Sequence, residues 1–232
     1  SDKKIISLVT SFSRGTAHGY SGLFCILEQY INNFEKFKDY YIVVWRDSQR
    51  GLIEIIKEYV SKDIIPYDKI IYIDSGVTYR FKTIYFIRNK WHMYPSFTGK
   101  YNFKLDIIRN YLVDFNKYPN DSYQDRICII KSSVSKNITC SGIVQQEKIE
   151  QFCKKYKLFQ LEPTNLHEVE FINRVYHAKI LVTSWGTCWF KNQVYLSDNC
   201  TDVYVLVIGS VFHNEYKKYN QRTKLRNTNI HY

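Results

Sequence analysis

The sequence predicts an α/β fold made of two Rossmann-like halves. Short apolar runs rich in β-branched residues alternate with stretches of helical periodicity, as in parallel sheets covered by helices. This pattern starts again after a polar, turn-rich segment at residues 117–124. The 232 residues are also enough for two cores, each in a half of about 110 residues. We therefore expect an N-terminal half over residues 1–118 and a C-terminal half over residues 119–232.

In the N-terminal half, continuous apolar runs predict buried strands at residues 5–10, 40–45, 69–73 and 83–88. Apolar residues at helical spacing predict helices at residues 23–37, 52–60 and 105–115. Residues 11–22 lie between the first strand and the first helix and are rich in glycine and serine. We expect them to form a substrate-binding loop.

The C-terminal half repeats the alternation of strand and helix. Its apolar runs predict strands at residues 126–131, 158–161, 179–183 and 203–208, the last of these being the final strand of the chain. Helical spacing predicts helices at residues 143–156, 166–177 and 188–196.

Charge and cysteine usage narrow the function classes. The formal net charge of +11 favours an anionic partner, but the lysines and arginines are scattered, without a long basic block or a nucleic-acid motif. We therefore favour nucleotide phosphates over nucleic acid.

The six cysteines form no CxxC and several lie in apolar runs, which is typical of reduced thiols in the cytoplasm. No apolar stretch is long enough for a membrane span.

Two segments have the composition of phosphate-binding loops. Ser184, Gly186 and Thr187 follow an apolar strand and precede a helix, where free backbone N–H groups can bind an anion. Lys131 and the serines after it follow another strand. If both segments lie at the carboxyl edge of one sheet, together they hold a diphosphate. The alternatives are a helix N-cap for the first segment and an exposed turn for the second.

His18 is a candidate general base, because it lies between glycines in the loop at residues 11–22 and its ordinary pKa is near neutral. Glu28, in the following helix, is the alternative base. A structural role for His18 stays open. The chain contains no Asp-x-Asp, so we expect no metal site and no cofactor.

Residues 125–209 resemble the family 61 glycosyltransferases. A strand enters the basic and hydroxyl turn at Lys131, a later strand ends in Leu161-Glu162-Pro163, and a glycine turn leads to Asn192. The first half is more loosely similar, through residues 22–28 and 67–72. The family usually has Arg in place of Lys131 and a His-Gly-Ala-Gly type of sequence at residues 184–188. The segment at residues 183–196 is equally similar to fucosyltransferase-like folds.

The resemblance implies a GT-B arrangement, in which the two halves face each other across a cleft. It implies inverting, metal-independent transfer from a nucleotide-sugar, with UDP favoured, to a glycan bound by the N-terminal half. The donor-binding residues are then Lys131, Ser132, Ser133, Ser184, Trp185, Gly186, Thr187, Cys188 and Asn192. In this arrangement we expect Arg14, Tyr20 and His92 to bind the acceptor, and either His18 or Glu28 to be the catalytic base.

Two other functions stay open. One is a basic nucleic-acid-binding module without catalysis, and the other is an inactive transferase-like domain that only binds glycans. The composition and the two ends of the sequence also suggest one domain of a larger polypeptide.

Overall fold

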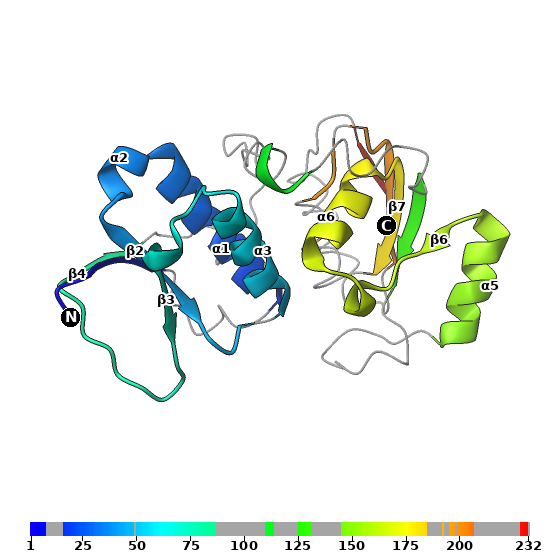
Figure 1. Cartoon of the computed structure of the whole chain (residues 1–232). Coiled ribbons are helices and arrows are strands. Elements are labelled where there is room, and N and C mark those ends of the chain that lie inside the picture. Colours follow the sequence, from blue (N-terminus) through cyan, green and yellow to red (C-terminus); the bar gives the residue numbers. More distant parts are fainter. Residues whose placement is uncertain are drawn as a thin grey trace. The chain divides into compact units, whose positions relative to one another are not determined.

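A computed structural model describes two compact units of the chain (Figure 1). The described residues are 1–7, 16–48, 50–86, 110–113, 125–130, 145–184, 192, 195–197, 199–206 and 228–231, with the backbone alone at 16–22, 25 and 164. Of these, residues 1–86 and 110–112 belong to the first unit and the rest to the second. The boundary expected between residues 118 and 119 lies outside the described residues.

The first unit contains a parallel sheet of four strands in the order β3-β2-β1-β4. The strands are β1 (Lys4–Ser7), β2 (Tyr40–Trp45), β3 (Ile70–Ile73) and β4 (Thr83–Phe86). Ile5 lies opposite Tyr41 of β2 and Ile84 of β4. The strand order reverses between β1 and β4, which makes their carboxyl ends the topological switch point of this sheet.

Among its described residues, the first unit has the helices α1 (Thr16–Asn32), α2 (Phe34–Phe37) and α3 (Arg50–Ser61), a 3₁₀ turn at η1 (Tyr67–Lys69), and helical residues at 110–112. Because β1-α1-β2 and β2-α3-β3 cross over in the same direction, α1 and α3 cover the same face of the sheet. The two helices are in contact and lie side by side in Figure 1. On the other face, Ile5, Val43 and Ile73 form a buried cluster with Trp45 and Phe81 packed against it.

The second unit contains a parallel sheet of five strands in the order β6-β5-β7-β8-β9. Its strands are β5 (Arg126–Ile129), β6 (Phe159–Gln160), β7 (Ile180–Ser184), β8 (Asp202–Leu206) and β9 (Asn229–His231). Its described helices are α5 (Gln146–Tyr156), η4 (Pro163–Asn165) and α6 (Glu168–His177). The α/β class and the two parallel sheets predicted from the sequence are therefore confirmed.

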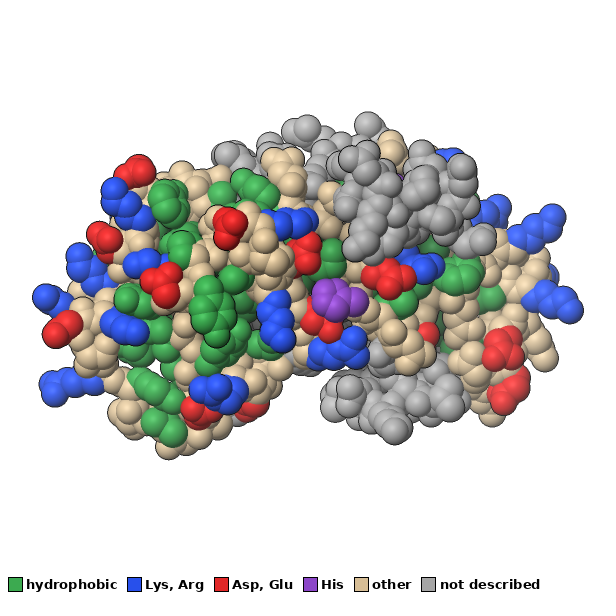
Figure 2. Space-filling view, viewed as in Figure 1, with side chains coloured by type: hydrophobic (Ala, Val, Ile, Leu, Met, Phe, Trp, Pro, Cys, Tyr) green, Lys and Arg blue, Asp and Glu red, His purple; other side chains and the backbone are tan. Residues whose placement is uncertain are grey.

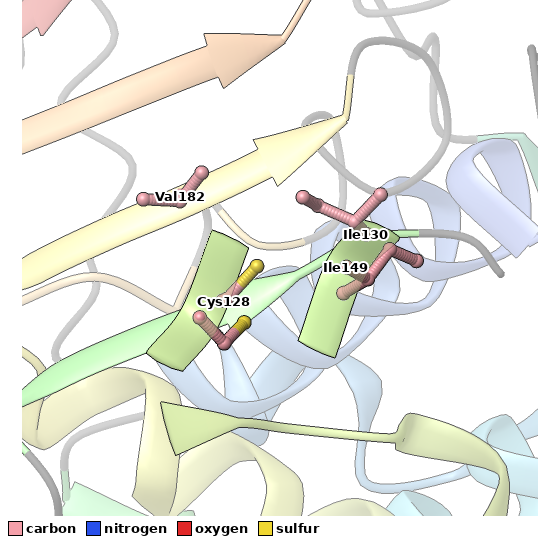
Figure 3. Close-up of a cluster of buried hydrophobic side chains, with 5 residues drawn as sticks. Cys128, Ile130, Ile149 and Val182 are labelled. Atoms are coloured by element: carbon pink, nitrogen blue, oxygen red, sulfur yellow. The ribbon is translucent and has the colours of Figure 1, made fainter. Parts of the chain in front are cut away.

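The helices α5 and α6 lie on opposite faces of this sheet, because the crossovers from β5 to β6 and from β6 to β7 run in opposite directions. Cys128 and Val182 point to the α5 face, where they pack with Ile130 and with Ile149 and Cys153 of α5 (Figure 3). Since side chains alternate along a strand, Leu181 and Thr183 point to the α6 face.

Three predicted elements need correction. The first helix begins at Thr16 instead of residue 23, so it includes most of the stretch predicted as a loop. Glycines at residues 19 and 22 each cost a helix about 1 kcal/mol relative to alanine, and the helix nevertheless continues through both.

The helix predicted over residues 188–196 does not reach its expected end, because Tyr195 lies in a turn and Leu196 is not helical. The backbone N–H of Tyr195 donates to the Asn192 carbonyl, and the N–H of Asn199 donates to Ser197 Oγ. A side-chain hydrogen bond to a nearby backbone N–H, such as the one that Ser197 accepts, competes with helix formation.

The strand predicted at residues 203–208 is not the final strand of the chain, because β9 pairs with β8 and follows it in the sequence.

Candidate functional site

The carboxyl ends of β5 and β7 form the topological switch point of the second sheet. These strands are neighbours, and on either side of them the chain order runs in opposite directions. Ile129 lies opposite Thr183, so Ile130 and Ser184 are the next residues at this edge. Ligands of open α/β sheets bind outside the carboxyl ends of strands at such a point.

Both predicted phosphate-binding segments follow directly from this edge. Lys131, Ser132 and Ser133 come after β5, and Trp185, Gly186, Thr187 and Cys188 come after β7. The two strands that precede these segments are neighbours in one parallel sheet, as a shared site at its carboxyl edge requires. The segments themselves lie outside the described residues, so their ligand contacts stay predictions.

Ser184 ends β7 with a buried hydroxyl. Only 4% of the residue is exposed, and its Oγ has no hydrogen-bond partner in the part of the chain that the structure describes. Ser184 lies on the same face of β7 as Val182, the α5 face. A buried hydroxyl without a partner costs about 1–3 kcal/mol, so a donor or acceptor from a ligand would stabilise this site.

Asn192 and Thr183 form a second buried polar group, on the α6 face. The Asn192 side-chain amide donates to Thr183 Oγ1 over 3.4 Å, and Asn192 is 1% exposed. Asn192 Oδ1 has no partner within the described ranges. Buried oxygens of Ser184 and Asn192 thus belong to opposite faces of the same strand end.

The turn after Asn192 is held against α6. The Tyr195 hydroxyl donates to Glu168 Oε1 over 3.4 Å, and the Tyr195 ring meets Phe171 edge to face at 6.2 Å. Glu168 is buried at the start of α6. Neither Thr183 nor Tyr195 is among the site residues expected from the sequence. The sequence feature that could have identified Thr183 is its hydroxyl group at the end of an apolar strand.

The candidate residues of the first unit lie along and before α1. His18 and Tyr20 fall in the first turns of the helix, and their side chains are outside the described part. Glu28 is half-buried and takes part in contacts with neighbouring groups. Arg14 and His92 lie outside the described residues. Ten helical residues separate His18 from Glu28, which is about 15 Å along the helix axis.

This separation distinguishes the two candidate bases. The helix α1 follows the carboxyl end of β1 and runs back along the sheet, so His18 is near the carboxyl edge and Glu28 is not. A single reacting group therefore cannot lie within reach of both residues. A base at the switch point of the first sheet fits His18 better.

Three cysteine thiols in the described part are free and buried, namely those of Cys128, Cys153 and Cys200. Burial raises the pKa of all three, and that of Cys200 reaches about 12. These thiols therefore remain protonated, and Cys128 packs as a small apolar side chain, as its apolar sequence context predicts. Within the described ranges no three His, Cys, Asp or Glu side chains gather as metal ligands, and no helix could span a membrane.

Comparison with protein-family models, with curated protein sequences and with solved structures gives no match to this chain. The resemblance to family 61 glycosyltransferases thus rests on the sequence motifs alone.

Proposed function

We propose that the chain is a glycosyltransferase that moves a sugar from a nucleotide-diphosphate donor, with UDP-sugars favoured, to a glycan acceptor. The observation that supports it most is the parallel pairing of β5 with β7 where the strand order reverses. Lysine, hydroxyl and glycine residues directly follow both strands. Such residues and free backbone N–H groups suit the two phosphates of the donor.

In this proposal the donor binds the C-terminal half and the acceptor the N-terminal half, as in the GT-B fold. An acceptor hydroxyl attacks the anomeric carbon from the face opposite the diphosphate. The new C–O bond forms while the bond from carbon to diphosphate oxygen breaks, which inverts the configuration. Lys131 and the backbone amides of residues 184–188 neutralise the leaving nucleoside diphosphate, so no metal is required.

The proton of the acceptor hydroxyl goes to a base of the N-terminal half, and we assign that role to His18. Its place in the first turn of α1, after the carboxyl end of β1, supports this choice over Glu28. Tyr20 and Arg14 are close to His18 in the sequence and are proposed to bind the acceptor, together with His92.

A thermal-shift screen with UDP, GDP, CMP and dTDP, each with and without Mn²⁺, tests the proposal. A nucleotide at a hundred times its dissociation constant stabilises the folded chain by about 2.7 kcal/mol. We expect the largest rise in melting temperature with UDP, and no dependence on Mn²⁺. No rise with any of the four would contradict the proposal, and binding of oligonucleotides would then favour the nucleic-acid-binding module.

A further inference from the structure

A groove lies beside the edge strand of the first sheet. Its volume is about 460 Å³, within the range of about 300–1,000 Å³ that is usual for small-molecule sites. One wall is a stripe of α3, and the other is the edge strand β3 with the turn before it. The lining side chains are Ile53, Ile56, Lys57, Val60, Tyr67 and Tyr72, with Arg46, Ser61 and Ile70 beside them.

The apolar surface of the groove is aromatic and aliphatic. Tyr67 is 80% exposed, while Tyr72 is partly buried on the α3 side of β3. Figure 2 shows hydrophobic side chains gathered over the region of α3 and β3, with Lys and Arg side chains at the border of this patch. A sugar ring presents a face of C–H groups that packs well on such tyrosine rings and aliphatic chains.

The charge of the groove is positive. Arg46 pairs with Asp74 at 2.7 Å and lies over the Tyr72 ring, with 5.8 Å between the guanidinium carbon and the ring centre. Lys57 is exposed and has no carboxylate partner among the described residues.

The acidic neighbours of Lys57 on α3 are already paired. Glu54 pairs with Arg50, and Glu58 pairs with Lys62. An anion in the groove would therefore meet a lysine that has no competing carboxylate.

We infer that this groove binds an acidic sugar unit, a saccharide that carries a carboxylate, as part of the acceptor glycan. The inference rests on the proposed function, because it names the substrate class for the N-terminal half. The ring packs on Tyr67 and Tyr72, and the carboxylate pairs with Lys57. Burial raises the pKa of Tyr72, with Tyr67 adding to the shift and Arg46 opposing it, so the Tyr72 hydroxyl stays a neutral donor.

Titration of the full chain with two disaccharides tests this inference by isothermal calorimetry and amide chemical shifts. One disaccharide ends in glucuronic acid and the other, of the same linkage, ends in glucose. We expect the acidic one to bind about threefold to fivefold more tightly, with its advantage lost in Lys57→Ala and reduced by added salt. The shifted amides should be those of Val60, Ser61, Ile70 and Tyr72.

Two variants sharpen the test. Lys148→Ala removes an exposed lysine of α5 and should leave both affinities unchanged. Tyr67→Ala should weaken both disaccharides, without loss of stability, because the side chain is exposed. Equal affinity for the two disaccharides, or equal behaviour of Lys57→Ala and Lys148→Ala, would overturn the inference. Tighter binding of an acidic peptide along β3 would also overturn it.

Nucleotide binding separates this inference from the proposed function. If UDP raises the melting temperature but neither disaccharide binds, the acidic-sugar groove is contradicted and the transferase proposal is not. Binding of the acidic disaccharide, without binding of any nucleotide, contradicts the transferase proposal and supports the groove as a saccharide site.

Discussion

The Asn192 side-chain amide donates a hydrogen bond to Thr183 Oγ1 at the carboxyl end of β7, and both residues are buried. This contact ties the chain after the predicted phosphate-binding segment back to the strand that precedes it. Asn192, the first described residue after Ser184, therefore lies at the carboxyl end of β7.

Replacing Thr183 with valine keeps the shape of the side chain and removes its hydroxyl. The loss should lower the free energy of unfolding by about 1–3 kcal/mol, because the buried Asn192 amide loses its acceptor. Denaturant unfolding of the second unit measures the change. Thr83→Val, at an exposed position of β4, is the control and should change stability little. An equal effect of the two substitutions would show that the contact contributes nothing.

The C-terminal strand β9 should be held less firmly at acid pH. His231 Nε2 lies 3.0 Å from Asp202 Oδ1, and its ring stacks on Tyr204 at 4.5 Å. The hydrogen bond from His231, with smaller ones from Thr201 and Asn229, holds the pKa of Asp202 below its ordinary value. The stabilisation is therefore complete above about pH 4 and is lost as the pH falls through the folded-state pKa.

Hydrogen exchange of the β9 amides between neutral and acid pH measures this effect. Protection should decrease at low pH in the natural chain and should be weak at every pH in Asp202→Asn. Asp68→Asn, in the first unit, is the control. Unchanged protection in Asp202→Asn would mean that β9 is held by its backbone alone. The contribution of so exposed a pair is at most about 1 kcal/mol.

The buried cysteines should resist alkylation. Only the thiolate reacts with iodoacetamide, and the raised pKa values keep Cys128, Cys153 and Cys200 protonated. At about pH 8 mass spectrometry should find all three unmodified in the folded chain and modified in guanidinium. Rapid modification of Cys128 or Cys153 in the folded chain would contradict the packing of α5 on β5.

Lys131→Ala should weaken binding of the nucleotide-sugar by at most about 3 kcal/mol, the scale of one charged hydrogen bond. Calorimetric titration with the nucleotide that gives the largest thermal shift measures the loss. Lys148→Ala removes the same charge from α5 and should bind as the natural chain does. An unchanged affinity in Lys131→Ala would remove this residue from the site.

Strands β1, β2, β5 and β7 could be predicted from the sequence because they are largely buried and appear as apolar runs. Residues 40–45 were predicted as a strand, and β2 has the same bounds. By contrast, β9 is three residues long and has no periodicity, and it is held by Asp202 and Tyr204, which are distant in the sequence. The early start of α1 includes two glycines, which helix propensity alone would place outside a helix.

For the candidate site, the sequence predicts which residue types could bind phosphate, but not which residues lie next to one another in the fold. Lysine, serine and glycine after two strands indicate phosphate binding wherever those strands lie. That β5 and β7 are adjacent follows only from the strand order, since β6 lies between them in the chain. The bond between Asn192 and Thr183 depends on side-chain packing that no spacing rule gives.

We propose that a nucleoside diphosphate binds at the carboxyl edge of β5 and β7. Titration of the isotope-labelled chain with UDP and with uridine, followed by amide chemical shifts, tests this binding. We expect UDP to shift the signals of Ile130 and Ser184, and uridine, which has no phosphates, to shift them far less. Shifts confined to the first unit or to β8 and β9, or no shift with UDP, would contradict it.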